Sequence, residues 1–112
     1  MRSDKGDMGF DAVVANAGRL NILTALAVDE RQEFVQLRQR THLTDGNLAC
    51  HAKRLAEAGL IHIDKSFRDG KPVTCLTLTA AGRAALEAHA RRVLAAISHR
   101  RVAMPVSSNP AG

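Results

Sequence analysis

Apolar residues recur with helical spacing over most of the first sixty positions. This spacing predicts a short helix from Phe10 to Asn16, a second over 17–27 and a third from Phe34 to Thr41. The charged connection 28–33 has room for a very short strand. The first nine residues, 1–9, are polar and contain glycine, so we expect a flexible N-terminus before the domain begins.

The best-marked helix covers about 44–58. Thr44 is placed to cap its start, Asp45 follows where negative charge suits the helix dipole, and Gly59 supplies the usual stop. An apolar seam is formed by Leu48, Ala52 and Leu55. The opposite face is polar, net basic and small near its start, and it carries Gly46, Asn47, Cys50, Lys53, Arg54 and Glu57. Such a face suits entry into a DNA major groove, and the alternative is an ordinary amphipathic helix with a solvated charged side.

After this helix the period changes from helical to alternating, which predicts a β-hairpin. Asp69-Gly70 is a strong two-residue turn signal between the two alternating runs. Counting back from this turn puts Ile63 opposite Leu76 and Ile61 opposite Leu78, so apolar residues pair across the hairpin. On the return strand, 73–78, we expect Cys75 and Thr77 to point outward.

The tip of the hairpin is basic. It contains Lys65, Arg68 and Lys71. A basic hairpin directly after a candidate recognition helix favours a wing, which lies along phosphates or places a cation in the minor groove. The alternative is a solvated turn whose charge serves solubility.

The last helix is long for so small a domain. Thr79 caps it, and it continues to about Arg100. Its apolar stripe consists of Leu86, Ala90, Val93, Leu94 and Ile97. The first eighty residues cannot cover this stripe, so we expect the same helix of a second copy to cover it in a homodimer. One domain is thus predicted over 10–100, followed by a disordered tail, 101–112, with proline and serine.

The charge and composition of the chain indicate the class of binding partner. The net charge is +5, with 16 Lys and Arg against 11 Asp and Glu, which favours an anionic partner such as nucleic acid. No Trp or Tyr and only three Phe are present, so stacking of single-stranded bases is not expected, and double-stranded DNA fits better. Cys50 and Cys75 form no CxxC pair, and neither a signal peptide nor a membrane span is found. We therefore expect a cytoplasmic protein with no membrane partner.

Three motifs in combination carry a family resemblance: AGRLNIL at 17–23, LTDGNLACHAKRLAEAGLI at 43–61 and LTLTAAGRAAL at 76–86. With this order of elements, the chain resembles winged helix-turn-helix transcriptional regulators of the MarR and ArsR type, especially small single-domain members. The resemblance implies a mainly α fold with a small β-hairpin wing and a long C-terminal dimerisation helix. It also implies an inverted-repeat operator bound by a homodimer.

The residues expected to contact DNA combine the basic pattern with the resemblance. They are Thr44, Asn47, Cys50, His51, Lys53, Arg54, Lys65, Arg68 and Lys71. Cys50 stands where such regulators usually carry Lys, Arg, Ser or Gln, and Ala52 stands where Leu is common. For Cys50 two interpretations stay open: an inert small side chain, or a thiol whose oxidation blocks DNA binding. Arg19, at a helix start, should have a partner, either Asp11 or a DNA phosphate.

Other functional classes have less support. The chain has no nucleophile motif, phosphate loop or metal motif, so we expect neither enzymatic activity nor a cofactor. A metal or redox sensor stays open, because Glu87, His89 and His99 share the last helix, but we assign no metal site. A winged-helix protein-interaction module without DNA binding is the other alternative. A small-molecule effector is left open.

Overall fold

In the computed structural model, the backbone is described for residues 12–103 and the side chains for residues 12–98. Residues 12–15 are helical, and the elements that follow are α2 (Ala17–Val28), β1 (Arg31–Glu33), α3 (Phe34–Thr41), α4 (Asp45–Glu57), β2 (Ile61–Arg68), β3 (Lys71–Leu78) and α5 (Ala80–Ala103). The predicted helices and the short strand are confirmed. The predicted flexible start 1–9, Phe10, Asp11 and the end of the tail, 104–112, lie outside the described residues.

The helices enclose a single apolar core. Asn16 separates the first helical turn from α2 and caps α2, because its Oδ1 accepts the backbone N–H of Arg19 at 3.0 Å. Fully buried side chains come from every helix of the body and from the sheet, among them Ile22, Leu23, Leu26, Leu37, Leu48, Leu55, Leu60 and Leu76. The seam predicted on α4 is therefore confirmed as part of the core.

A sharp corner joins α3 to α4. His42 ends α3 in the left-handed conformation, with a φ of 62°. The Thr44 side chain caps α4 by accepting the Asn47 backbone N–H at 3.1 Å, as predicted. Asn21 of α2 donates to the Thr41 carbonyl at 3.0 Å, which ties the corner to the body. The two helices thus form a helix-turn-helix pair whose second helix has a fixed orientation.

The hairpin has the predicted register. β2 and β3 pair with Ile63 opposite Leu76 and Ile61 opposite Leu78. Asp69 and Gly70 both have positive φ, 54° and 77°, as a two-residue type I′ turn requires. The sheet has a third strand, β1, and its order is β1-β3-β2.

The third strand corrects one expectation. Cys75, predicted to point outward, is buried with 8% of its surface exposed. β3 is the central strand here, and Cys75 lies between Glu33 of β1 and Asp64 of β2. Thr77, also predicted outside, is half-buried and receives a hydrogen bond from Arg31 at 3.2 Å. The sheet was predicted as a hairpin of two strands, so burial of β3 by its second neighbour, β1, was not part of the prediction.

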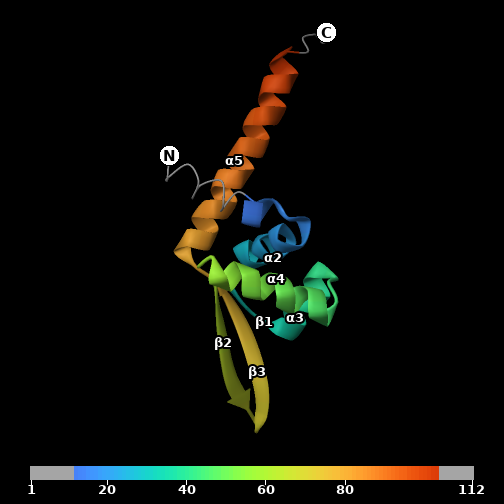
Figure 1. Ribbon diagram of the computed structural model, residues 1–112, viewed down its shortest axis with the longest axis vertical. Helices are drawn as coiled ribbons and strands as arrows, with labels where there is room; N and C mark the ends of the chain where they lie inside the picture. Colours follow the sequence, from blue (N-terminus) through green and yellow to red (C-terminus); the bar gives the residue numbers. More distant parts are fainter. Residues whose placement is uncertain (1–11, 104–112) are drawn as a thin grey trace.

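The last helix begins on the body and then leaves it. The Thr79 hydroxyl caps α5 by accepting the Gly82 backbone N–H at 2.9 Å. α5 extends to Ala103, three residues beyond the expected end at Arg100. In Figure 1 the outer part of α5 and the β2–β3 hairpin project from opposite ends of the body. The Cα radius of gyration is accordingly 17.7 Å, against about 13 Å for a compact domain of this size.

Gly82 allows α5 to lie close to the body. A Cβ at this position would lie 2.0 Å from the Leu60 carbonyl oxygen and 2.8 Å from Leu78 Cδ1. We expect Gly82→Ala to lower the free energy of unfolding by at least about 1–3 kcal/mol, because backbone must move to accept the methyl group. Gly46→Ala is the matched control, since nothing lies within 4 Å of a Cβ there. Urea unfolding of both variants tests this, and equal midpoints would contradict the close approach.

Candidate nucleic-acid interface

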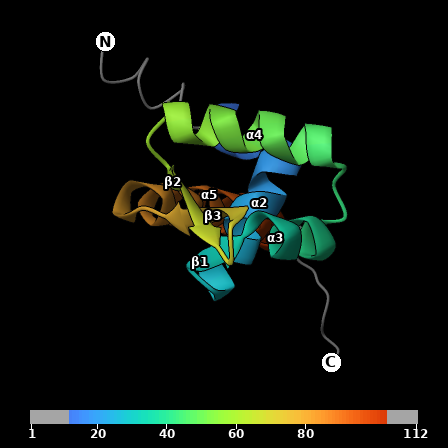
Figure 2. The same ribbon diagram turned by 90° about the horizontal axis from the view of Figure 1, so that it is seen from below.

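The outer face of α4 is open to solvent. Every residue assigned to it from the sequence is exposed: Gly46, Asn47, Cys50, Lys53, Arg54 and Glu57. Leu48, Ala52 and Leu55 hold the helix to the core on the other side. Figure 2 shows α4 along one edge of the molecule, with the hairpin directed toward the viewer beside it. The helix therefore presents one polar surface beside the hairpin.

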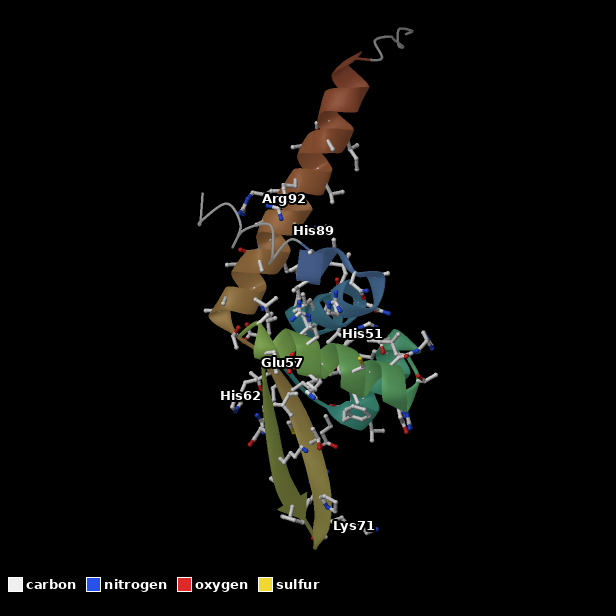
Figure 3. The ribbon with its side chains drawn as sticks, viewed as in Figure 1. His51, Glu57, His62, Lys71, His89 and Arg92 are labelled. Carbon is white, nitrogen blue, oxygen red and sulfur yellow. The ribbon has the colours of Figure 1, made fainter. Side chains whose placement is uncertain are left out.

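His51 lies differently from the other α4 candidates. A Cβ on Gly18 of α2 would lie 2.5 Å from the His51 Nε2, so the imidazole packs on the bare backbone of that glycine. Nδ1 is buried and makes no hydrogen bond within the described residues. Figure 3 shows His51 between α4 and α2. The side chain thus contributes to the contact between these helices, and it lies on the flank of the outer face.

Arg68 is turned toward the body. Its guanidinium pairs with Glu33, the residue that ends β1 and caps α3. This hydrogen bond raises the pKa of the Arg68 guanidinium above its ordinary value. The second ion pair, from Arg31 to Asp64 at 3.0 Å, likewise joins β1 to β2 and raises the pKa of Arg31, chiefly through the hydrogen bond. Both pairs are largely exposed, so they orient the hairpin more than they stabilise it.

The other basic candidates of the hairpin are free to reach outward. Lys65 and Lys71 are exposed, and Figure 3 shows Lys71 at the tip. A groove of about 400 Å³ lies between α4 and the hairpin; we call it the α4–wing groove. It is lined by Phe34, Ala49, Ala52, Lys53, Ile63, Lys65, Thr74 and Leu76. The fold therefore brings Lys53 and Lys65 to one groove although they lie on different elements.

Arg19 has a local partner, but a different one from those expected. Its Nε donates to the Val13 carbonyl at 2.8 Å. Asp11, the carboxylate proposed from the sequence, lies outside the described residues. The arginine closes the turn between residues 12–15 and α2, so its position is explained without a phosphate.

The outer part of α5 carries uncovered apolar side chains. Val93, Leu94 and Ile97 have 44%, 62% and 49% of their surfaces exposed. Ala90 is exposed and Leu86 is half-buried against the core. The stripe predicted from the sequence is thus open to solvent in the single chain beyond Leu86.

Within residues 12–98, no three His, Cys, Asp or Glu side chains come together in a way that could hold a metal ion. The His99 side chain, one of three suggested sensor residues, lies outside the described residues. Among the described helices, none is both long and apolar enough to span a bilayer.

Sequence reasoning missed three residues that shape this end of the molecule. Glu33 and Asp64 hold the hairpin through the ion pairs above. Phe67, near the hairpin tip, has 77% of its surface exposed. Strand alternation puts Phe67 on the same face as Ile61 and Ile63, a signal that could have been used. The ion pairs join residues at least 33 positions apart and leave no local signal.

Comparison with known proteins agrees with this architecture. A model of the winged helix DNA-binding domain family matches residues 19–97. An uncharacterized protein of Methanocaldococcus jannaschii is 36% identical over 85 residues, which are 76% of this chain and 88% of that protein.

Solved structures with the same fold include transcriptional regulators. A transcriptional regulator homologue from Pyrococcus horikoshii has a TM-score of 0.76 at 27% identity, over 88% of this chain and 97% of the other. MarR of Staphylococcus aureus, solved with salicylate and kanamycin, has a TM-score of 0.66 at 22% identity, over 83% and 61% of the two chains. At 22% identity, the similarity to the Staphylococcus aureus protein shows a shared fold alone. The predicted resemblance is confirmed for the family and the fold: the chain belongs to the winged helix DNA-binding domain family and has the MarR-type fold.

Proposed function

We propose that the protein binds double-stranded DNA as a homodimer at an inverted-repeat operator. α4 enters the major groove as the recognition helix, and the β2–β3 hairpin acts as a wing on the flanking backbone. The observation that carries this proposal is that the exposed basic helix α4 and the projecting hairpin lie side by side, with Lys53 and Lys65 lining one groove between them.

The dimer is proposed from α5. A stripe containing Val93, Leu94 and Ile97 would otherwise remain in water on a helix that has left its own body. The same helix of a second copy covers it in a self-complementary, two-fold contact. Two-fold symmetry then relates the two recognition helices, and the half-site centres should lie about 10 bp apart or a multiple of that spacing.

The contacting residues have different chemistry and therefore different roles. Asn47 and Arg54 have the bidentate groups that suit adenine and guanine edges. Thr44, Lys53, Lys65 and Lys71 suit phosphate oxygens and fix the register of the complex. Cys50 lies between them on the outer face, where a small side chain permits close approach.

His51 and Arg68 contribute to the interface indirectly: His51 positions α4, and Arg68 positions the wing. His51 fills the space over Gly18 and sets the distance between α4 and α2. Arg68 holds the wing to Glu33. Exchange of that carboxylate for a DNA phosphate would give Arg68 a direct contact, at the cost of the wing's ion pair.

Selection from random DNA with the purified full chain tests the proposal. We expect recovery of duplexes with an inverted repeat, a footprint over both half-sites, and affinity that falls steeply as salt rises. A footprint over one half-site would contradict the dimer. Failure to recover any duplex, with no salt-dependent shift of genomic fragments, would contradict DNA binding and favour a protein-interaction module.

Cys50 allows a separate test of regulation by oxidants. Its thiol is exposed on the outer face of α4, so a sulfenic acid or a larger adduct there would meet DNA. If the protein responds to redox conditions, peroxide should weaken DNA binding of the wild type and leave Cys50→Ser unchanged. Cys75 is buried and serves as the internal comparison, through Cys75→Ser. Equal loss in wild type and Cys50→Ser would identify Cys50 as an inert small side chain.

A further inference from the structure

The wing tip carries an apolar surface in addition to its cations. Phe67 has 77% of its surface exposed, and it faces Pro72 across the hairpin. From the two-residue turn, Arg68 and Lys71 form the first, hydrogen-bonded pair, so Phe67 and Pro72 form a non-hydrogen-bonded pair, in which side chains lie closer. The wing thus ends in two adjacent apolar rings.

The direction of this surface follows from the register. Alternate residues of a strand share a face, so Phe67 lies on the same side of β2 as Lys65 and Ile63. Those two line the α4–wing groove together with Ala52 and Lys53 of α4. Phe67 therefore continues the side of the hairpin that faces the recognition helix.

The tip stands clear of the rest of the sheet. β1 pairs only with positions 75–77 of β3. The four pairs from Lys65–Thr74 to Arg68–Lys71 form a two-stranded ribbon beyond that point, and Figure 1 shows this ribbon projecting from the body. Arg68 and Lys71 pair across the turn on the opposite face, where Glu33 holds Arg68, so Lys65 is the cation on the face of the apolar rings and Lys71 lies at the tip next to Pro72.

Resting on the DNA-binding function proposed above, we propose that Phe67 is an apolar wedge that enters a base step of the minor groove next to the recognition-helix site. The partner is DNA because the rings continue the side of the hairpin that lines the α4–wing groove, where Lys53 and Lys65 lie, and an anionic backbone complements these cations and Lys71 at the tip. Minor-groove proteins use Phe and other apolar side chains to unstack and kink such steps.

The size of the wing supports insertion with distortion. Its two strands lie about 4.8 Å apart, so with backbone atoms the ribbon is wider than the roughly 6 Å minor groove of B-DNA. The groove must open for the tip to enter. Partial insertion of the Phe67 ring unstacks a step and kinks the duplex toward the major groove, which widens the minor groove for Lys65 and Lys71.

Phe67 consequently determines sequence preference without a hydrogen bond to a base. Pyrimidine–purine steps such as TA and CA unstack most easily, so they should be favoured at the wing position. A stiff A-tract there should weaken the wild type by about tenfold.

The test uses the full chain and a duplex that the wild type selects from random DNA. 2-Aminopurine replaces one adenine at the wing position located by footprinting, and fluorophores at the duplex ends report bending. We expect wild type to raise 2-aminopurine fluorescence and bend the duplex. Phe67→Ala should bind roughly tenfold more weakly, lose the fluorescence rise and the A-tract discrimination, and keep its salt slope because no charge is removed.

Three further variants control the result. Phe67→Leu should retain most of the unstacking, since leucine is also a wedge residue. Lys71→Ala should show the reverse pattern, with a smaller salt slope and retained unstacking. Val28→Ala removes another exposed apolar side chain, 80% exposed at the end of α2, and should change nothing. Thermal unfolding by circular dichroism should be alike for wild type and Phe67→Ala.

The remaining outcomes distinguish failure of the wedge from failure of the proposed DNA-binding function. DNA binding by wild type without a fluorescence rise, or equal unstacking by Phe67→Ala, would overturn the wedge and leave the proposed function standing. A lower oligomer mass for Phe67→Ala would assign the rings to a contact between copies and also overturn it. If no duplex is selected and genomic fragments show no salt-dependent shift, the DNA-binding function fails and the wedge fails with it.

Discussion

Leu94→Asp is expected to give a monomer that has lost at least about 10²-fold in affinity for the inverted-repeat operator. Leu94 is 62% exposed in the single chain, and in the proposed dimer the aspartate would be buried against an apolar helix. A monomer binds one half-site and loses the effective concentration that links the two halves, which supplies about 10²–10⁴ in affinity. Light scattering should report the chain mass of 12.0 kDa, and titration of a labelled operator should report the affinity.

Ala95→Asp is the matched control for this dimer test. Ala95 is the next residue of α5, is exposed, and lies outside the apolar stripe. The same charge at this position should leave a dimer that binds the operator. A Leu94→Asp protein that keeps its dimer mass would place the interface elsewhere, and monomeric Ala95→Asp would show that any added charge on α5 is sufficient.

Asn47→Ala and Arg54→Ala should each cost about 1–3 kcal/mol per half-site and relax the preference for one base pair there. Both side chains are exposed on the outer face of α4, and the dimer carries each substitution twice, so the total loss should be about double. Binding to randomised operators, read by sequencing of bound and free pools, measures affinity and preference together.

Lys71→Ala supplies the contrast that distinguishes base readout from anchoring. Lys71 lies at the wing tip, so its loss should weaken binding to all sequences alike and flatten the salt slope by about one unit for each phosphate contact removed. If Asn47→Ala and Arg54→Ala both keep the original preference while Lys71→Ala alters it, α4 is not the element that reads the sequence.

Several elements could be predicted because their signals are local. The start of α4 was predicted from Thr44 as an N-cap, and its hydroxyl accepts the Asn47 N–H. The hairpin register followed from the two-residue Asp69-Gly70 turn, because strand pairing propagates from such a turn one residue at a time. The exposed stripe on α5 followed from a helical period longer than the body could cover. These features depend on residues within a few positions of one another.

The same local patterns predicted the positions of the candidate interface residues only in part. They correctly indicated which side of α4 is open, since the periodicity that buries Leu48 and Leu55 exposes Asn47 and Arg54. They grouped His51 with the contact residues, although the imidazole packs on Gly18 from an earlier helix. Which residue of α2 faces α4 depends on the packing of the two helices, and that packing leaves no mark near His51.

The sequence alone therefore determined the order of elements, their bounds to within a few residues and the open faces of α4 and α5, because caps, turns and periodicity act over short distances. The tertiary structure decided which side chains of the sheet are buried and which form ion pairs. Pairing of β1 with β3 buries Cys75, and it brings Glu33 to Arg68 and Arg31 to Asp64. These partners come from strands separated by a helix-turn-helix unit, so only the folded chain brings their charges within hydrogen-bonding distance.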